Sequence, residues 1–128
     1  MDFPEDRKYT QTHEWAKVEG DVVRMGLTSY ALEQLGDIIY LDLPEEGTAV
    51  DKGVPFGEIE SVKAVGELLS PVTGEIAEVN ETMMDELDAM AEDPWGAGWL
   101  LVIAPADLSE LDGLMDAAAY AEHCEKEA

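Results

Sequence analysis

Lys63 lies between two stretches of the chain that are predicted to be extended. The stretches meet at residues 61–64, a length that suits a hairpin loop. A lysine at such a tip has a flexible stem and an exposed amine that a modifying enzyme can reach. Acylation would remove the charge of the amine and make the side chain the root of a long arm. The alternative is that Lys63 only solvates a turn, as most lysines do.

Two similar stretches flank this lysine. Residues 47–59 and 66–79 each contain a glycine, an apolar strand and the triplet Gly-Glu-Ile, which occupies residues 57–59 in the first and 74–76 in the second. Two half-motifs on either side of one lysine predict a quasi-symmetric pair of sheets, joined at a hairpin that displays Lys63.

The elements that would position the lysine are mostly short strands. Apolar runs recur about every 8–12 residues with turn residues between them, a spacing typical of a small β-sandwich or barrel. The first two runs form a hairpin about Gly20, and Pro44 ends the third. The predicted strands are residues 15–18, 22–27, 38–43, 54–62, 75–80 and 99–103.

Helices are expected at three places. Thr28 can cap a short helix that Gly36 ends. Residues 81–92 are rich in helix formers and carry methionines near helical spacing. Beyond Pro105 the apolar period becomes helical, with residues 108, 111, 114 and 115 on one face, so a C-terminal helical segment is predicted.

The charge of the chain is strongly one-sided. It has 30 acidic and 7 basic residues, a formal net charge of −23, and residues 64–125 contain no lysine or arginine. Such a surface repels nucleic acid and anionic membranes, so neither is an expected partner. Apolar residues at strand and helix spacings argue against disorder. We therefore expect a folded protein from a halophilic microbe, in which salt screens the self-repulsion; the alternative is an acidic surface that serves only solubility.

Compartment and redox state follow from what the chain contains. The sequence contains no run of about 18 apolar residues, the length needed to span a membrane. The first ten residues lack a signal-peptide pattern, so the cytoplasm is the expected location. The single cysteine, Cys124, fits a reducing compartment, and its acidic neighbours favour the protonated thiol. His123 and Cys124 lack the further ligands of a metal site, and His13 beside Trp15 is expected to be structural, so no metal is predicted.

Lys63 is part of a longer pattern, with Gly47 16 residues before it and Gly74 11 residues after it. The pattern consists of Glu60-Ser61-Val62-Lys63-Ala64, Thr12-His13-Glu14-Trp15, Leu35-Gly36-Asp37-Ile38, Leu43-Pro44-Glu45, Ser70-Pro71-Val72-Thr73-Gly74-Glu75-Ile76, Asp93-Pro94-Trp95-Gly96 and Gly98-Trp99-Leu100. From about residue 9 to residue 120, in one register, the chain resembles the glycine cleavage H proteins, which are lipoyl carriers. It departs from the family pattern at Gly66, Glu67 and Trp95, where the family often has a small hydroxyl residue, an aspartate and a tyrosine.

This resemblance implies a mainly β fold of the lipoyl and biotinyl kind. It would be a barrel-sandwich hybrid of two antiparallel sheets with a short N-terminal helix and a C-terminal helix. Residues 1–128 would form a single lipoyl-carrier domain, with a core at about residues 22–104 and the C-terminal helical segment at about residues 107–126. The protein is expected to be a monomer.

The resemblance also implies a function. A lipoate ligase or lipoyl transferase would join lipoate to Lys63 through an amide bond. The arm would shuttle the aminomethyl group of glycine from a PLP-dependent glycine decarboxylase to a tetrahydrofolate-dependent aminomethyltransferase, and a dihydrolipoamide dehydrogenase would reoxidise it. The chain would be a non-catalytic carrier, because the chemistry belongs to the cofactor.

Two acidic residues resemble family acids that line the groove where the loaded arm rests. They are Glu14 and Glu67, and a carboxylate in that groove would hold the ammonium of the loaded arm by a charge-assisted hydrogen bond. The alternative is that both are solvated surface carboxylates in a chain that has many.

Other functions stay open. The chain could carry lipoate for another pathway, such as 2-oxoacid dehydrogenation, a lipoyl relay or sulfur transfer, or it could be an unmodified acidic binding module. A biotin carrier is disfavoured, because its lysine usually lies between methionines and Lys63 lies between Val62 and Ala64. A free-standing enzyme is disfavoured, because the sequence shows no nucleophile–base pair, metal cluster or phosphate loop.

Overall fold

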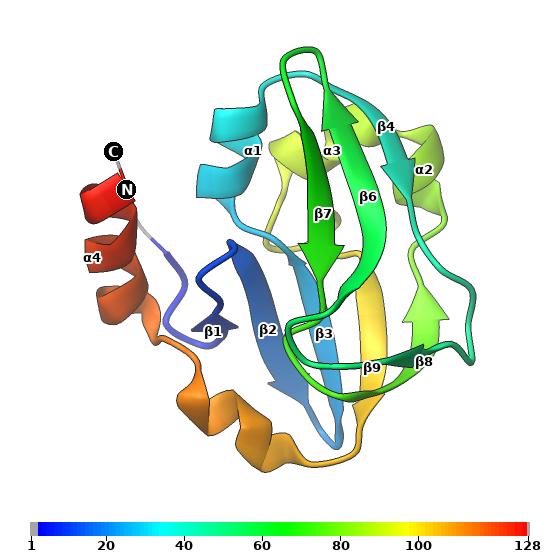
Figure 1. Ribbon diagram of the computed structural model, residues 1–128, viewed down its shortest axis with the longest axis vertical. Helices are drawn as coiled ribbons and strands as arrows, with labels where there is room; N and C mark the ends of the chain where they lie inside the picture. Colours follow the sequence, from blue (N-terminus) through cyan, green and yellow to red (C-terminus); the bar gives the residue numbers. More distant parts are fainter. Residues whose placement is uncertain (1–2, 128) are drawn as a thin grey trace.

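Two antiparallel sheets pack against each other in the computed structural model, which describes residues 3–127 (Figure 1). The larger sheet has the strand order β1-β2-β3-β9-β8-β5 and the smaller sheet the order β4-β6-β7. The strands are β1 (Lys8–Tyr9), β2 (Glu14–Glu19), β3 (Val22–Leu27), β4 (Ile38–Asp42), β5 (Ala49–Val50), β6 (Pro55–Ser61), β7 (Val65–Leu69), β8 (Gly74–Val79) and β9 (Leu101–Pro105). The helices are α1 (Ser29–Leu35), α2 (Thr82–Asp85), α3 (Leu87–Glu92), the 3₁₀ helix η1 (Leu108–Gly113) and α4 (Ala117–Glu127). The predicted mainly β fold of two antiparallel sheets with short helices is confirmed.

The two repeated stretches each give one strand to each sheet. The first stretch supplies β5 to the larger sheet and β6 to the smaller, and the second supplies β7 to the smaller and β8 to the larger. β6 pairs with β7, and β5 pairs with β8. Each half of the repeat therefore crosses from one sheet to the other, and the two halves pair strand for strand, with residues 62–64 at the turn between them.

The glycine of each Gly-Glu-Ile triplet sits against the backbone of a neighbouring strand. A Cβ atom on Gly57 would overlap the carbonyl oxygen of Asp42 in β4, and one on Gly74 would overlap the carbonyl oxygen of Ala104 in β9. The isoleucines two residues on, Ile59 and Ile76, are both buried. The repeat therefore has a physical cause: each copy needs a residue without a side chain where two strands approach closely.

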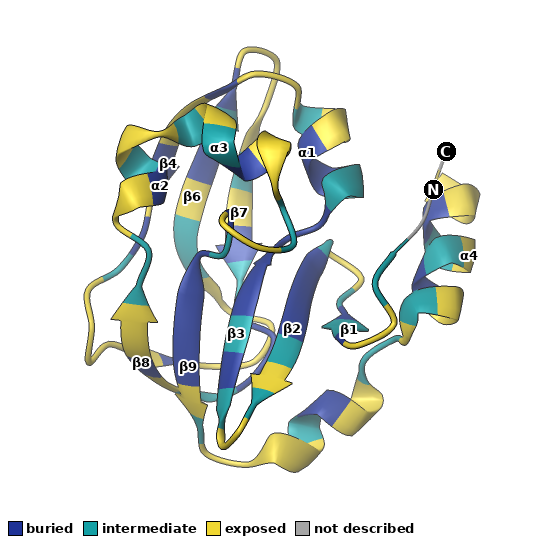
Figure 2. Cartoon of the chain, turned by 180° about the vertical axis from the view of Figure 1, so that it is seen from behind, coloured by how far each residue is buried: buried dark blue, intermediate teal, exposed yellow. Residues whose placement is uncertain are grey.

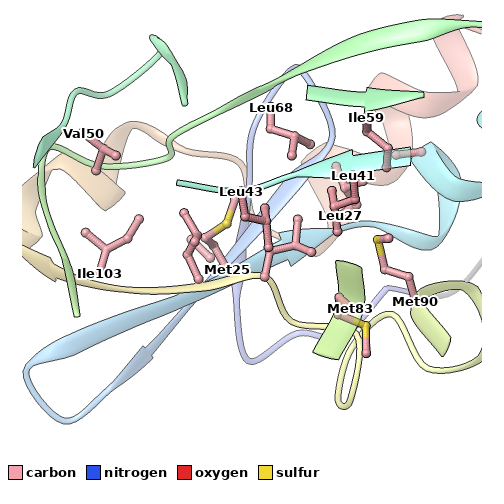
Figure 3. Packing of buried hydrophobic residues seen from close by; sticks show 14 of the residues in the cluster. Met25, Leu27, Leu41, Leu43, Val50, Ile59, Leu68, Met83, Met90 and Ile103 are labelled. Atoms are coloured by element: carbon pink, nitrogen blue, oxygen red, sulfur yellow. The ribbon is translucent and has the colours of Figure 1, made fainter. Parts of the chain in front are cut away.

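The main core lies between the two sheets (Figure 3). β3 contributes Met25 and Leu27, and the smaller sheet faces them with Leu41, Ile59 and Leu68, all buried. Figure 2 shows that the larger sheet has buried residues along β3 and β9 and along the first half of β2. Burying each such side chain contributes roughly 1.5–3 kcal/mol, so this layer is the main source of stability.

The first hairpin and the first helix form where the sequence predicts them. Gly20, with φ of 67°, makes the turn between β2 and β3. The hydroxyl of Thr28 accepts a hydrogen bond from the backbone N–H of Ala31 (3.1 Å), which caps α1. Gly36 ends the helix with φ of 77°, and its N–H donates to the carbonyl of Leu32. Local capping chemistry fixes this helix.

The helix predicted for residues 81–92 is wrong in one respect: it is two short helices. The chain breaks at Glu86, whose φ of −123° and ψ of 66° lie outside the helical region. Both α2 and α3 contact β4, and each buries one methionine, Met83 and Met90. The break allows each helix to pack on the sheet, so tertiary packing overrides the local preference for one longer helix.

The C-terminal segment is also less regular than predicted. η1 is a 3₁₀ helix whose Leu111 is buried, while Leu108, placed on the same apolar face by sequence, is exposed. Met115 is not helical, because its backbone exchanges two hydrogen bonds with Tyr9 (2.8 and 2.9 Å). The α-helix α4 begins only after this bridge, at Ala117.

A second, aromatic cluster joins the two ends of the described chain. The rings of Tyr9 and Tyr120 stack with their centroids 4.7 Å apart, and Trp15 and Cys124 are buried beside them. Trp95, one of the departures from the family pattern, meets Tyr9 edge-on at 6.1 Å. This cluster holds α4 against β1 (Figure 1).

None of the helices within residues 3–127 has both the length and the apolar character needed to cross a bilayer.

The close contacts of Gly57 and Gly74 with the backbone of neighbouring strands lead to a prediction about stability. Gly57→Ala and Gly74→Ala should each lower the free energy of unfolding by about 1–3 kcal/mol, because the added methyl group meets backbone that cannot move away. Gly66→Ala is the matched control, since a Cβ there would lie 3.6 Å from the nearest Ile59 atom, an ordinary contact. Urea unfolding of the three variants checks this. Equal midpoints for Gly74→Ala and Gly66→Ala would contradict the explanation of the repeat.

Candidate functional site

Lys63 sits on a tightly fixed hairpin loop. The backbone N–H of Ser61 donates to the carbonyl of Ala64 (2.8 Å), and the Ser61 hydroxyl accepts from the N–H groups of Lys63 (3.3 Å) and Ala64 (3.1 Å). The N–H of Val62 donates to the carbonyl of Asp37 (3.1 Å), which ties the loop to the chain before β4. Ser61 is buried, so water does not compete for these hydrogen bonds, and its hydroxyl holds the loop backbone in one conformation. The loop therefore presents Lys63 in a defined direction.

The side chain of Lys63 is exposed. None of the described carboxylates pairs with its ammonium group, whereas Lys17, for example, pairs with Asp6 at 3.5 Å. Its stem passes Gly36, where a Cβ atom would lie 3.5 Å from the lysine Cε. In a chain of such negative charge, an unpaired amine at a loop tip is accessible to a reagent or an enzyme.

Apolar side chains surround the tip. Ile39, Val62 and Val65 are 56%, 66% and 69% exposed, although large aliphatic residues are usually buried. Tyr40 and Val65 lie in one row across the smaller sheet, because each pairs with Glu60 of β6. Large exposed apolar patches on proteins often mark surfaces that bind other molecules. The projecting end of the β6–β7 hairpin is visible in Figure 1.

β7 leads from the tip toward a cavity. Along this strand Leu68 points into the core, whereas Val65, Glu67 and Leu69 lie on the opposite face. Glu67 is exposed, and Leu69 lines the cavity. The outer face of β7 is thus a continuous path from the loop that bears Lys63 to the cavity.

The cavity has a volume of about 300 Å³ and forms where four segments of the chain meet. Its walls come from the β1–β2 connection, the end of β7 with the turn after it, the turn before β6, and the residues between η1 and α4. The lining residues are Tyr9, Thr10, Gln11, Thr12, Glu14, Lys52, Gly53, Leu69, Ser70, Pro71, Gly113, Leu114 and Met115.

Glu14 is a buried carboxylate in the wall of this cavity. It is 1% exposed, and its Oε1 accepts hydrogen bonds from the hydroxyls of Thr10 (2.6 Å) and Thr12. Burial raises the pKa of Glu14 to about 7, although hydrogen bonds from the two hydroxyls and from the backbone N–H of Leu69 act in the opposite direction. Near neutral pH this carboxyl is therefore partly protonated and ready to ionise when a cation comes close.

The two acids predicted from the sequence, Glu14 and Glu67, lie in different places. Glu14 lines the cavity, whereas Glu67 stands on the exposed face of β7 outside the lining and pairs across the sheet with Glu58. Lys63 does not line the cavity either and lies at the far end of β7. Sequence reasoning missed the hydroxyls of Thr10 and Thr12, whose only signal is their alternation with Glu14 along the chain.

Cys124 has the surroundings of a structural thiol. It is buried in the aromatic cluster, and burial raises its pKa, which favours the protonated form. A protonated thiol is also what its acidic chain neighbours predict. His13, expected to be structural, does bond to the fold, since its Nδ1 lies 2.7 Å from the hydroxyl oxygen of Tyr120.

Comparison with known proteins identifies the family. The family model described as "Glycine cleavage H-protein" matches residues 7–127. The glycine cleavage system H protein of Myxococcus xanthus is 51% identical over 118 residues, 92% of each chain, and that of Thermus thermophilus is 47% identical over 128 residues, all of both. A crystal structure of a glycine cleavage system H protein from Mycobacterium marinum superposes with a TM-score of 0.88 at 40% identity, covering 98% of this chain and 100% of that one. Since sequence and fold agree over nearly the whole length, the chain belongs to the glycine cleavage H-protein family.

Proposed function

We propose that this protein is the lipoyl carrier of a glycine cleavage system and that lipoate is joined to Lys63 through an amide bond. The main support for the proposal is the position of Lys63. Its amine is exposed, and the backbone of its loop is fixed by hydrogen bonds to the buried Ser61. A fixed backbone keeps the direction in which the arm leaves, while the flexible lysine stem gives it reach. Lipoate would supply a dithiolane that accepts the aminomethyl group of glycine.

The protein's own residues would present and shelter the arm. The apolar side chains at the tip, Ile39, Val62 and Val65, would form part of the surface that the enzymes of the system recognise. The outer face of β7 would guide the arm toward the cavity, whose mixture of apolar walls and one buried acid suits a chain with a cationic end. Shelter in the cavity would slow attack by water.

Glu14 would hold the ammonium group of the loaded arm. A cation beside the carboxyl favours the ionised form, so binding would release the proton that Glu14 retains near pH 7. The grip should therefore strengthen as the pH rises through 7 and weaken below it. Glu67, exposed on β7, would add only long-range attraction along the path.

The partners and the location are also proposals. We infer that a PLP-dependent glycine decarboxylase, a tetrahydrofolate-dependent aminomethyltransferase, a dihydrolipoamide dehydrogenase and a lipoate ligase or lipoyl transferase act on this chain, which is monomeric between encounters. The unpaired Cys124 supports a reducing compartment, the cytoplasm. Tethering the arm to a small carrier raises its effective concentration at each enzyme that binds the carrier.

A halophilic origin is the further part of the proposal. The charge of −23 is distributed over carboxylates that are almost all outside the core, since Glu14 is the only buried carboxylate among residues 3–127. Glu58 and Glu67 even face each other across β6 and β7, an arrangement that costs stability unless salt screens it.

Attachment can be tested by mass. Lys63→Arg should abolish the lipoyl mass increment in protein from a lipoylating host and should abolish glycine–carbon dioxide exchange with the decarboxylase, because the guanidinium is not acylated by the ligase. Lys126→Arg, at another exposed lysine, is the control and should be lipoylated and active. A Lys63→Arg protein that supports exchange would disprove the attachment site.

Shelter of the arm can be tested by hydrolysis. Glu14→Gln should speed formaldehyde release from isolated, loaded protein by roughly ten- to a hundredfold, the equivalent of a charge-assisted hydrogen bond of about 1.5–3 kcal/mol. Glu67→Gln should change it much less. In wild type the release should slow as the pH rises through 7, whereas Glu14→Gln should lack this step. Equal rates in wild type and in the Glu14→Gln, Glu67→Gln double variant would refute the role of these acids.

A stability measurement separates a folding defect from lost binding in these variants. The pKa of Glu14 is raised in the folded state, so the native protein binds more protons than the unfolded chain between pH 4.5 and about 7 and loses stability over that interval as the pH rises. Glu14→Gln should therefore unfold at higher denaturant than wild type at pH 8, and at nearly the same concentration at pH 4.

Salt dependence tests the halophilic proposal. The melting temperature should rise steadily with potassium chloride, because screening acts on repulsion between carboxylates more than about 10 Å apart once salt reaches about 0.1 M. Glu67→Gln should raise stability by about 0.2–1 kcal/mol in dilute buffer, by relieving its pairing with Glu58, and the gain should vanish in concentrated salt. A melting temperature that is flat from dilute buffer to multimolar salt would remove the physical basis of the proposal.

A further inference from the structure

His13, His123 and Glu127 converge at the junction of the β1–β2 connection and the helix α4. The Nε2 atom of His13 lies 2.8 Å from Oε2 of Glu127, and Nε2 of His123 lies 3.1 Å from the same oxygen. The two imidazole centroids are 5.6 Å apart. One potential ligand atom from each side chain lies within 4.8 Å of the other two. More than a hundred residues of chain separate His13 from the other two, so only the fold brings them together.

We propose that these three side chains form a binding site for one divalent transition-metal ion of the zinc class. Zinc is bound by histidine nitrogens and carboxylate oxygens at about 2.0–2.2 Å, so ligands around one tetrahedral ion lie about 3.3 Å from each other. The separations of 2.8 and 3.1 Å require only small side-chain movements to reach that spacing. Three protein ligands leave the fourth position for water.

The helix places two of the ligands without strain. His123 and Glu127 are four residues apart in α4, and residues at this spacing face the same side of a helix. Both are accessible, at 26% and 41% side-chain exposure, so an ion can reach them from solvent. Cys124, the neighbouring soft ligand, is turned into the aromatic cluster and takes no part.

The third ligand is held by a hydrogen-bonded support. The Nδ1 atom of His13 lies 2.7 Å from the Tyr120 hydroxyl oxygen, which lies 2.7 Å from the hydroxyl oxygen of Thr28. If His13 donates from Nδ1–H to Tyr120 and Tyr120 donates to Thr28, the lone pair on Nε2 is free to face an ion. A second ring nitrogen bonded in this way orients metal-binding histidines in general. The backbone of His13 has a positive φ of 72°, which is uncommon for a residue other than glycine.

The choice of metal follows from the ligand atoms. Two imidazoles and one carboxylate suit zinc, nickel or copper, and they do not suit calcium or magnesium, which prefer oxygen. His123 Nε2 also lies 3.1 Å from the carbonyl oxygen of Gln11 and would give up that hydrogen bond to bind an ion. A bound ion would join α4 to the segment that supplies the hydroxyl partners of Glu14, so it would stabilise one wall of the cavity. The site does not depend on lipoylation.

Metal titration of the untagged, full-length protein tests the proposal. After treatment with a chelator, the protein should bind one zinc ion in molar potassium chloride with excess magnesium, conditions that suppress non-specific binding to surface acids. Binding to the native state only should raise the melting temperature. Cobalt should give visible absorption bands typical of tetrahedral nitrogen and oxygen ligation. No saturable binding under these conditions would overturn the proposal.

Variants locate the ion. Glu127→Gln and His123→Gln, both on the accessible face of α4, should each weaken zinc binding at least tenfold without loss of the fold, and the double variant should lose the cobalt bands. Glu125→Gln removes an exposed carboxylate from the same helix and should bind zinc like wild type. His13→Asn tests the third ligand, because asparagine tolerates a positive φ. Equal affinity in wild type and in the His123→Gln, Glu127→Gln double variant would show that the ion binds elsewhere.

Discussion

Antiparallel pairing between β6 and β7 fixes both the position of Lys63 and one wall of the cavity that contains Glu14. The pairing is stabilised by Ile59 and Leu68, which the two strands send into the core. At one end of the hairpin the strands close on Lys63, and at the other end Leu69 reaches the cavity. A weaker core would therefore loosen the loop that bears Lys63 and the cavity together, since one pair of strands supports both.

The acidic residues fall into two groups: many carboxylates on the surface and one buried carboxylate, Glu14, among the described residues. Carboxylates cover the outside, where solvent and salt screen them, and Glu14 alone is withdrawn from water among the described acids. Withdrawal raises its pKa toward neutrality and makes its ionisation responsive to a nearby cation. Lys63 is placed in the opposite way, as an exposed cation that pairs with none of the carboxylates within residues 3–127. The same fold thus provides an exposed amine at a loop tip and a sheltered carboxyl that can ionise.

The aromatic cluster connects these parts to the ends of the described chain. Tyr120 of α4 stacks on Tyr9 of β1 and has its hydroxyl oxygen close to both His13 and Thr28. It thereby positions the segment between β1 and β2, whose threonine hydroxyls hold Glu14. The C-terminal helix is accordingly part of the support of the cavity, although it contributes no residue to its lining.

The sequence by itself determined the features that depend on neighbours along the chain. The turn at Gly20, the cap of α1 at Thr28 and the hairpin that bears Lys63 all follow from local turn and capping chemistry, and resemblance to the family indicated the two-sheet fold. Local preference failed at Glu86, where packing on β4 splits the expected helix.

Only the tertiary structure decided the properties that depend on distant segments. The burial and raised pKa of Glu14 arise because four separate segments close around one carboxyl, and a pattern of residue types does not encode that closure. The same holds for Glu67, which stands outside the cavity, and for the meeting of His13 with His123. The burial of Glu14 and the meeting of the two histidines both depend on contacts between residues far apart in sequence. These contacts form only once the sheets have packed.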